Sequence, residues 1–426
     1  MNEYGFLRNE ARALLTRLRQ LSPFSLTMPM TWAATISDGA MKAIDKHLEK
    51  VKRELRQSVE QFLAWLETAE KQRVAPEKIQ SRYALLKLRF NSILDQLDIF
   101  ADVLAQRAEH HTGVWVGGLD ALAEDSLRLP VKLYESPPVV CFLERGHGAA
   151  IRRARTRLPG GDLNPVAVIQ VPRERMVGSG IGASLIHEVG HQGASLLSLV
   201  ETLRGAIRQA AAKDPANARA WKLYEQWISE IAADLWAMGH LGIGATQGLM
   251  SVVSLPQYFV FRMPDGNDPH PFPWIRVELS LAFGNLLFPH PQWANLTKIW
   301  RSLYPPTGLP AEKSALIRQL KTAMPRFVRL VATHRSKQLG NRRLVDILPY
   351  RNRQPAQLMA LFRRWQQTPS AWLAQPPSLV FAVIGQARAS GQIAPQAENQ
   401  LLTRCLTHWA KQQRESPKVI RPLIHQ

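Results

Sequence analysis

The sequence predicts an α+β fold that is mainly helical, and three regions of the 426-residue chain indicate it. Residues 1–112 place apolar side chains at the three- and four-residue spacing of amphipathic helices. Residues 113–300 mix short apolar segments, typical of strands, with further helical segments. Residues 301–426 again have a helical pattern. We therefore expect three parts: an N-terminal helical region, a central α+β domain and a C-terminal helical region.

The N-terminal region is expected to contain two long antiparallel helices. The first begins near Ser37 or Asp38 and ends near Lys71. A turn containing Pro76 separates it from a second helix over about 78–110, whose apolar side chains keep helical register. Such a hairpin commonly packs as a plain bundle on the neighbouring domain, and the alternative is an arm that binds a partner.

Three apolar segments of the central region are predicted to be strands, at 131–134, 139–143 and 166–171. A free edge on the last of them would let an extended peptide add to the sheet. A glycine-containing loop follows, in which Ser179 is a candidate N-cap, and an apolar helix begins near Ile181.

This helix contains the sequence His-Glu-Val-Gly-His at residues 187–191. Side chains four residues apart share a helix face, so His187 and His191 can present two imidazoles to one metal ion. Glu188 is offset around the helix and faces the open side of the metal, where a water would sit. Gly190 would cost about 1 kcal/mol relative to alanine in a helix, which indicates close backbone packing near the metal.

A catalytic zinc needs three protein ligands and one open position, so a third ligand must come from elsewhere. Glu230 is the best candidate, because it lies in the next strongly helical stretch, with Asp234 one turn later on the same face. His240 is a rival, but near a helix end it is better explained as a complement to the helix dipole or a cap. The alternative for the first motif is a surface helix that carries two histidines by chance.

Three motifs together resemble a known family. They are the segment 187–191, Glu-Ile-Ala-Ala-Asp at 230–234, and His-Pro at 270–271 followed by an arginine at 276. They resemble the gluzincin zinc metallopeptidases, most of all the Ste24/HtpX type, over roughly residues 130–280. The resemblance implies a zincin-like catalytic domain in the central region, with one Zn²⁺ per chain bound by His187, His191 and Glu230. It also implies Glu188 as general base and acid, Asp234 as the partner of a zinc histidine, and two donors to the substrate carbonyl, His270 and Arg276.

The chemistry of these residue types favours the same roles. Zinc lowers the pKa of a bound water towards neutrality, and Glu188 would take the proton of that water and pass it to the leaving amine. The oxyanion that develops needs further donors, for which His270 and Arg276 are suitable. The alternatives are a loop histidine at 270, a surface cation at 276 and a solvated carboxylate at Asp234. The predicted function is a zinc-dependent endopeptidase that acts on a peptide or protein substrate.

Composition and the apolar segments bear on the cellular compartment of the protein. Hydrophobic residues make up 46% of it, enough for a globular core. The two cysteines, Cys141 and Cys405, cannot form a disulfide framework and are expected to be buried thiols in a reducing compartment. The N-terminus lacks a secretory signal, and the apolar stretch at 23–36 is too short to span a bilayer. We expect a soluble cytoplasmic protein without a transmembrane segment, although export without a cleavable signal would look the same.

Charge is concentrated at the C-terminal end. Residues 301–426 contain 20 Lys and Arg against 4 Asp and Glu, a net charge of +16, whereas the first 300 residues account for only +4 of the total of +20. An anionic partner such as nucleic acid or an acidic protein is one explanation, and a solvated basic face without a partner is the other. No zinc-finger spacing, nucleotide-binding glycine loop or RNA-recognition motif accompanies the charge. The alternative function is a catalytically idle zincin scaffold that binds through this region.

Overall fold

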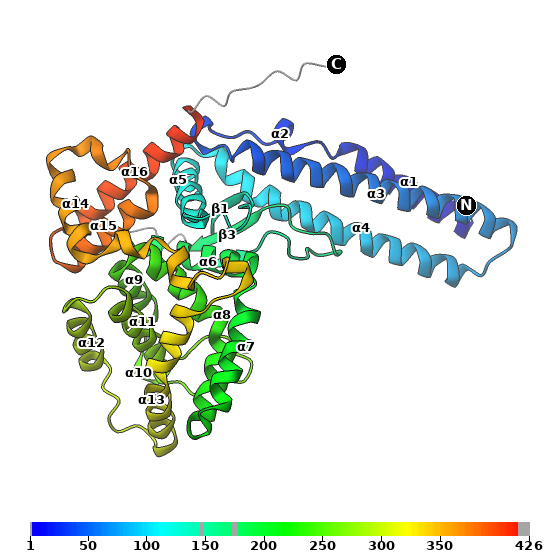
Figure 1. Cartoon of the computed structure of the whole chain (residues 1–426). Helices are drawn as coiled ribbons and strands as arrows, with labels where there is room; N and C mark the ends of the chain where they lie inside the picture. Colours follow the sequence, from blue (N-terminus) through cyan, green and yellow to red (C-terminus); the bar gives the residue numbers. More distant parts are fainter. Residues whose placement is uncertain (1, 145–148, 173–177, 416–426) are drawn as a thin grey trace. The chain divides into compact units, whose positions relative to one another are not determined.

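The computed structural model describes residues 2–144, 149–172 and 178–415, and this part of the chain is mainly helical with one small sheet (Figure 1). It confirms the α+β, mainly helical class. The chain divides into two compact units. The first comprises Met1–Val116, Pro137–Val140 and Arg152–Val168, and the second comprises Gly117–Ser136, Cys141–Ile151 and Ile169–Gln426. Residues 301–412 therefore belong to the same unit as most of the central region.

The first unit contains the predicted helical hairpin. Helix α3 (Asp38–Lys71) and helix α4 (Pro76–Ala105) lie side by side and antiparallel (Figure 1). The hydroxyl oxygen of Ser37 accepts a hydrogen bond from the backbone N–H of Ala40, which fixes the start of α3. Pro76 occupies the first turn of α4, where its missing N–H costs nothing. Helix α1 (Glu3–Gln20), which the sequence analysis did not single out, packs against both.

The sheet has three strands in the order β1-β3-β2. Strand β1 (Val139–Glu144) and strand β3 (Ala167–Pro172) confirm two predicted strands, and β2 (Ala150–Arg152) was missed because it is only three residues long. The strand predicted at 131–134 is wrong: these residues form bends. The hydroxyl of Tyr134 bonds back to the carbonyl of Leu127 at the end of α5 (His110–Leu127), so the segment folds onto that helix.

The predicted free edge of the strand at 166–171 is also wrong. Strand β3 lies in the middle of the sheet, with β1 on one side and β2 on the other. An extended peptide can therefore add only to the outer strands β1 or β2. The sequence did not indicate this, because strand order depends on pairing between distant segments.

The second unit is built around α8 (Ala218–Leu241), which packs against α6 (Gly180–Leu196), α7 (Leu199–Ala212) and α9 (Ile243–Val253). Further helices of this unit are α11 (Pro273–Leu287), α12 (Gln292–Leu303), α13 (Ala311–Thr333), α14 (Pro355–Gln367), α15 (Pro377–Ala389) and α16 (Pro395–Glu415). Helix α15 also contacts α6, α8 and α9. The segment predicted as a separate C-terminal region thus supplies part of the core around α6.

Helix α6 begins at the predicted place, but its capping differs from the expectation. Ser179 is the N-cap residue, yet its side chain makes no capping bond. Instead its backbone N–H donates to Oε1 of Glu398, a buried carboxylate of α16, at 2.7 Å. A negative charge at a helix N-terminus is favourable, so a residue 219 positions away stabilises the start of α6.

Gly190 is explained by close packing, as predicted. A Cβ atom at this position would lie 2.8 Å from Cβ of Trp236 and 2.9 Å from Cα of Ala233, both on α8. The absence of a side chain therefore lets α6 and α8 approach closely at the level of the two histidines.

Cys141 and Cys405 are buried, as predicted. Along the described residues, no helix combines the length and the apolar character needed to cross a membrane.

Candidate metal centre

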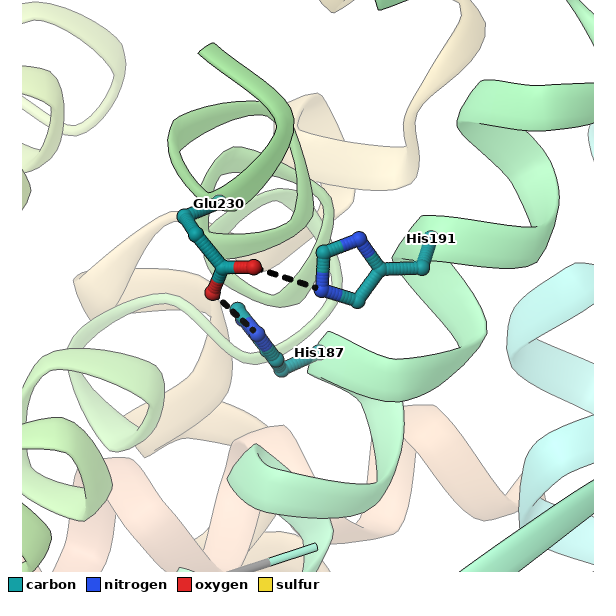
Figure 2. A group of neighbouring side chains, drawn as sticks. All are labelled: His187, His191 and Glu230. Atoms are coloured by element: carbon teal, nitrogen blue, oxygen red, sulfur yellow. Dashed lines mark ion pairs between the residues drawn. The ribbon is translucent and has the colours of Figure 1, made fainter. Parts of the chain in front are cut away.

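Helices α6 and α8 bring the three predicted ligands together (Figure 2). Nε2 of His187 lies 3.3 Å from Oε2 of Glu230, and Nε2 of His191 lies 3.3 Å from Oε1 of the same carboxylate. One ligand atom from each residue falls within 4.8 Å of the others. The i, i+4 spacing on α6 sets the two imidazoles on one face, and the close contact of α6 with α8 supplies the glutamate.

The donor set and its spacing fit a divalent cation. Two ligands of one tetrahedral zinc, with bonds of about 2.0–2.2 Å, are separated by about 3.3–3.5 Å. The nitrogen-to-oxygen distances of this site agree with that separation. Two imidazoles and one carboxylate are also a known catalytic zinc set, with a fourth position for water or substrate.

Electrostatics keep Glu230 ionised. Burial raises the pKa of its carboxyl group, but the hydrogen bonds and charges of His187 and His191 lower it further, to well below the usual range. For His187, burial lowers the pKa, whereas the charge of Asp234 and the hydrogen bonds to Asp234 and Glu230 raise it to about 9. A metal ion bound here would take the place of the proton on Nε2 of His187, because a ring nitrogen must lose its proton to bind a metal.

Asp234 and Arg276 lie behind His187. Nδ1 of His187 is 2.8 Å from Oδ1 of Asp234, so this carboxylate orients the ring with Nε2 towards Glu230. Arg276 donates to both oxygens of Asp234, from Nε at 2.8 Å and from Nη2 at 2.9 Å. Burial raises the pKa of Asp234, but Arg276 and His187 lower it to about 2. Arg276 therefore orients Asp234, and its Nη2 also lies 3.4 Å from Oε2 of Glu230 and 3.4 Å from Nε2 of His187, beside the ligand atoms.

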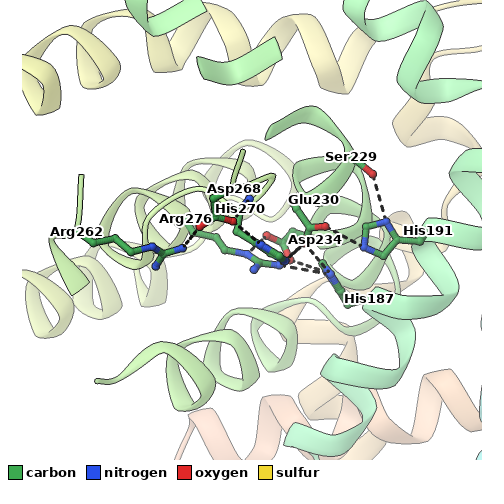
Figure 3. A network of polar contacts seen from close by, with 9 residues as sticks. All are labelled: His187, His191, Ser229, Glu230, Asp234, Arg262, Asp268, His270 and Arg276. Atoms are coloured by element: carbon green, nitrogen blue, oxygen red, sulfur yellow. Dashed lines mark hydrogen bonds and ion pairs between the residues drawn. The ribbon is translucent and has the colours of Figure 1, made fainter. Parts of the chain in front are cut away.

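His270 reaches Glu230 from a loop before α11 (Figure 3). Its Nε2 lies 3.4 Å from Oε2 of Glu230, and its Nδ1 lies 2.8 Å from Oδ1 of Asp268. Asp268 in turn accepts a hydrogen bond from Nη2 of Arg262 at 2.8 Å. The His270 side chain is 47% exposed, so it borders both the metal ligands and the solvent.

Glu188 lies on α6 between the two histidines in sequence and is 8% exposed. Burial raises the pKa of its carboxyl group, and the nearby His187 and His191 partly oppose this effect. A carboxylate with a raised pKa is better matched to proton transfer near neutral pH.

Three residues of this network were missed by the sequence analysis: Ser229, Arg262 and Asp268. The hydroxyl oxygen of Ser229 lies 3.4 Å from Nδ1 of His191, on the side of the ring away from Glu230. The only sequence signal for Asp268 was its place two residues before His270, and Arg262 had none.

The predicted role of His240 as a cap or dipole complement is wrong. Its ring is 2% exposed, and neither ring nitrogen has a hydrogen-bond partner within the described structure. Burial and the nearby charge of Arg353 lower the pKa of His240 to about 3, so the ring is neutral. Arg353 takes the capping role instead, because its Nε donates to the His240 carbonyl at 3.0 Å, in the last turn of α8.

The basic run of the C-terminal region is partly neutralised. Arg343 and Arg351 both pair with Asp346, at 2.7 and 3.0 Å, and Arg353 is buried. The exposed residues of the run are Arg342, Arg351, Arg363 and Arg364, and of these Arg351 is paired with Asp346.

Comparisons with protein-family models, with curated proteins and with solved structures found no match to this chain. The fold and the geometry define a mainly helical protein with a two-histidine, one-glutamate group that could hold a metal ion.

Proposed function

We propose that the chain is a zinc-dependent endopeptidase of the gluzincin type, with a zincin-like catalytic domain. The observation that carries the proposal is the convergence of His187, His191 and Glu230 within 4.8 Å, with Glu188 beside them on α6. A zinc ion bound there would act as a Lewis acid and make a water molecule more acidic.

Glu188 is assigned the proton transfers. Its carboxylate takes a proton from the attacking water and delivers it to the nitrogen of the departing amine. Its burial supports this role, because the raised pKa lets one group act first as a base and then as an acid.

His270 is assigned the stabilisation of the substrate oxyanion. Its ring is partly exposed beside Glu230, and the contact of Nδ1 with Asp268 leaves Nε2 facing the site. A fixed donor at this position stabilises charge that develops on the carbonyl oxygen. Arg276 is assigned as the second donor to the substrate carbonyl: Asp234 holds its guanidinium in place, and its Nη2 lies 3.4 Å from Oε2 of Glu230, beside the ligand atoms.

The alternative, an idle scaffold that binds through the basic C-terminal region, has less support. A scaffold does not require Glu188, and the pairing of Arg343 and Arg351 with Asp346 reduces the charge available to a partner.

The first experiment is elemental mass spectrometry on the wild type and on Glu230→Ala, both purified without added metal. The proposal expects about one zinc per wild-type chain and much less in the variant. Absence of metal in the wild type, even after zinc is added back, would overturn it. Loaded protein is then assayed on a fluorescently labelled casein.

A further inference from the structure

A groove of about 1090 Å³ lies between helices α11, α12 and α13. None of the metal-centre residues is among the described residues that line it. Helix α11 packs against both α12 and α13, so it forms the floor of the groove and the other two helices form its walls. All three helices belong to the second unit and are labelled in Figure 1.

The groove has the length of a helical segment. Each of the three helices lines it with a stripe at helical spacing: 278–286 on α11, 293–302 on α12 and 321–329 on α13. At 1.5 Å per residue, each stripe is about 12–14 Å long, which is a little more than two helical turns. The three stripes are similar in length and border one groove. In a four-helix bundle, the fourth helix would occupy such a groove.

The floor and walls carry apolar side chains. They come from all three helices: Leu281 and Leu286 from α11, Trp293 from α12, and Met324 and Val328 from α13. Leu281, Trp293, Met324 and Val328 are buried beneath the surface of the groove. The apolar side chains exposed in it are Leu286, Pro289, Ala294 and Pro325. An apolar surface of this kind in a concave site is typical of a docking groove.

The charges along the groove are mostly positive. Four cations line it: Lys298, Arg301, Lys321 and Arg329. They face one carboxylate, that of the buried Glu278, which accepts two hydrogen bonds from Arg301 at 2.8 and 2.6 Å and lies 4.0 Å from Nζ of Lys321. The groove therefore keeps an excess of three positive charges.

We propose that this groove binds an acidic amphipathic helix of a partner protein. The apolar face of such a helix covers Leu286, Ala294 and Pro325, and its flanking Asp and Glu side chains pair with Lys298 and Arg329. The last residues of the chain itself, 416–426, contain Lys418 and Arg421 and no acidic residue, so they carry the wrong charge for the groove. This binding site is separate from the proposed catalytic activity.

The probe is a fluorescein-labelled 15-residue peptide with leucines on one helical face and glutamates on the other. Its matched control has lysine in place of every glutamate. Fluorescence anisotropy with the full chain is expected to show binding of the acidic peptide with a Kd below about 100 μM, weaker at higher salt, and no comparable binding of the basic peptide.

Two groove variants test the location of binding. Ala294→Trp fills the groove, and Lys298→Glu with Arg329→Glu reverses two exposed charges. Each is expected to weaken binding about tenfold or more. The matched control, Lys222→Glu with Arg318→Glu, makes the same charge change at exposed positions of α8 and α13 outside the groove, and it should bind within about threefold of the wild type.

Circular dichroism of every variant verifies that it is folded. The proposal is overturned if the acidic peptide does not bind, if the basic peptide binds as tightly, or if the groove variants bind the acidic peptide as well as the control variant does. Glu230→Ala should bind the peptide as the wild type does, so a failure of the zinc proposal is distinguishable from a failure of this one.

Discussion

At the scale of single residues, Glu188 and His187 are neighbours on α6 with different assigned roles. Glu188→Gln removes the proposed base but no ligand, so the variant should keep its zinc and lose about 10²–10⁴-fold in hydrolysis. Metal content and hydrolysis of labelled casein are measured on the same preparation. His187→Ala is the companion variant, and it should lose the metal as well. Full activity of Glu188→Gln would mean that another group moves the proton.

Substitution of Asp234 tests whether its contact with Nδ1 of His187 strengthens zinc binding. Asp234→Asn keeps the size of the side chain but removes the charge that holds Nδ1 of His187, 2.8 Å away. We expect zinc affinity to fall about 10- to 100-fold, as measured by titration against a competing chelator. Glu201→Gln, which removes an exposed charge on α7, is the matched control and should bind zinc normally. Equal affinity of both variants would remove Asp234 from the site.

At the scale of elements, the contact of α6 with α8 sets the position of the ligands. Gly190→Ala places a methyl group 2.8–3.0 Å from atoms of Trp236 and Ala233, so the helices must separate. We expect a loss of about 1–3 kcal/mol in the free energy of unfolding, together with weaker zinc binding. Urea unfolding and the chelator titration measure the two effects.

Gly205→Ala is the control for this substitution, because it makes the same change on α7 where no atom lies within 4 Å of the new methyl group. It should leave zinc binding unchanged and stabilise the helix by up to about 1 kcal/mol. If Gly190→Ala behaved like Gly205→Ala, the close contact between α6 and α8 would not matter for the site.

At the scale of the whole molecule, the buried ring of His240 makes stability depend on pH. The pKa of this histidine is about 3 in the folded chain and 6.5 when it is unperturbed. Between these values the unfolded chain binds a proton that the folded chain does not, so stability decreases as pH falls below about 6.5. From pH 8 to pH 5 the wild type should lose about 2 kcal/mol more than His240→Gln. Urea unfolding of both at the two pH values measures the difference, and parallel losses would contradict the prediction.

Local physics explains what the sequence predicted well. The hairpin of α3 and α4 follows from an apolar stripe, a serine cap at 37 and a proline at 76, all of which act within a few residues. The pairing of His187 with His191 follows from helical spacing alone. The choice of Glu230 as their partner also needed the expectation that a second helix packs beside α6, and the structure places that residue there.

The remaining features depend on contacts between segments that are distant in sequence. The central place of β3, the cap that Glu398 provides for α6, and the engagement of Arg276 by Asp234 all join such segments. So does the groove of α11, α12 and α13, because no single helix shows which of its faces stays uncovered. Sequence spacing determines which side chains share a face of one element. Packing, which minimises the free energy of the whole chain, determines which faces meet.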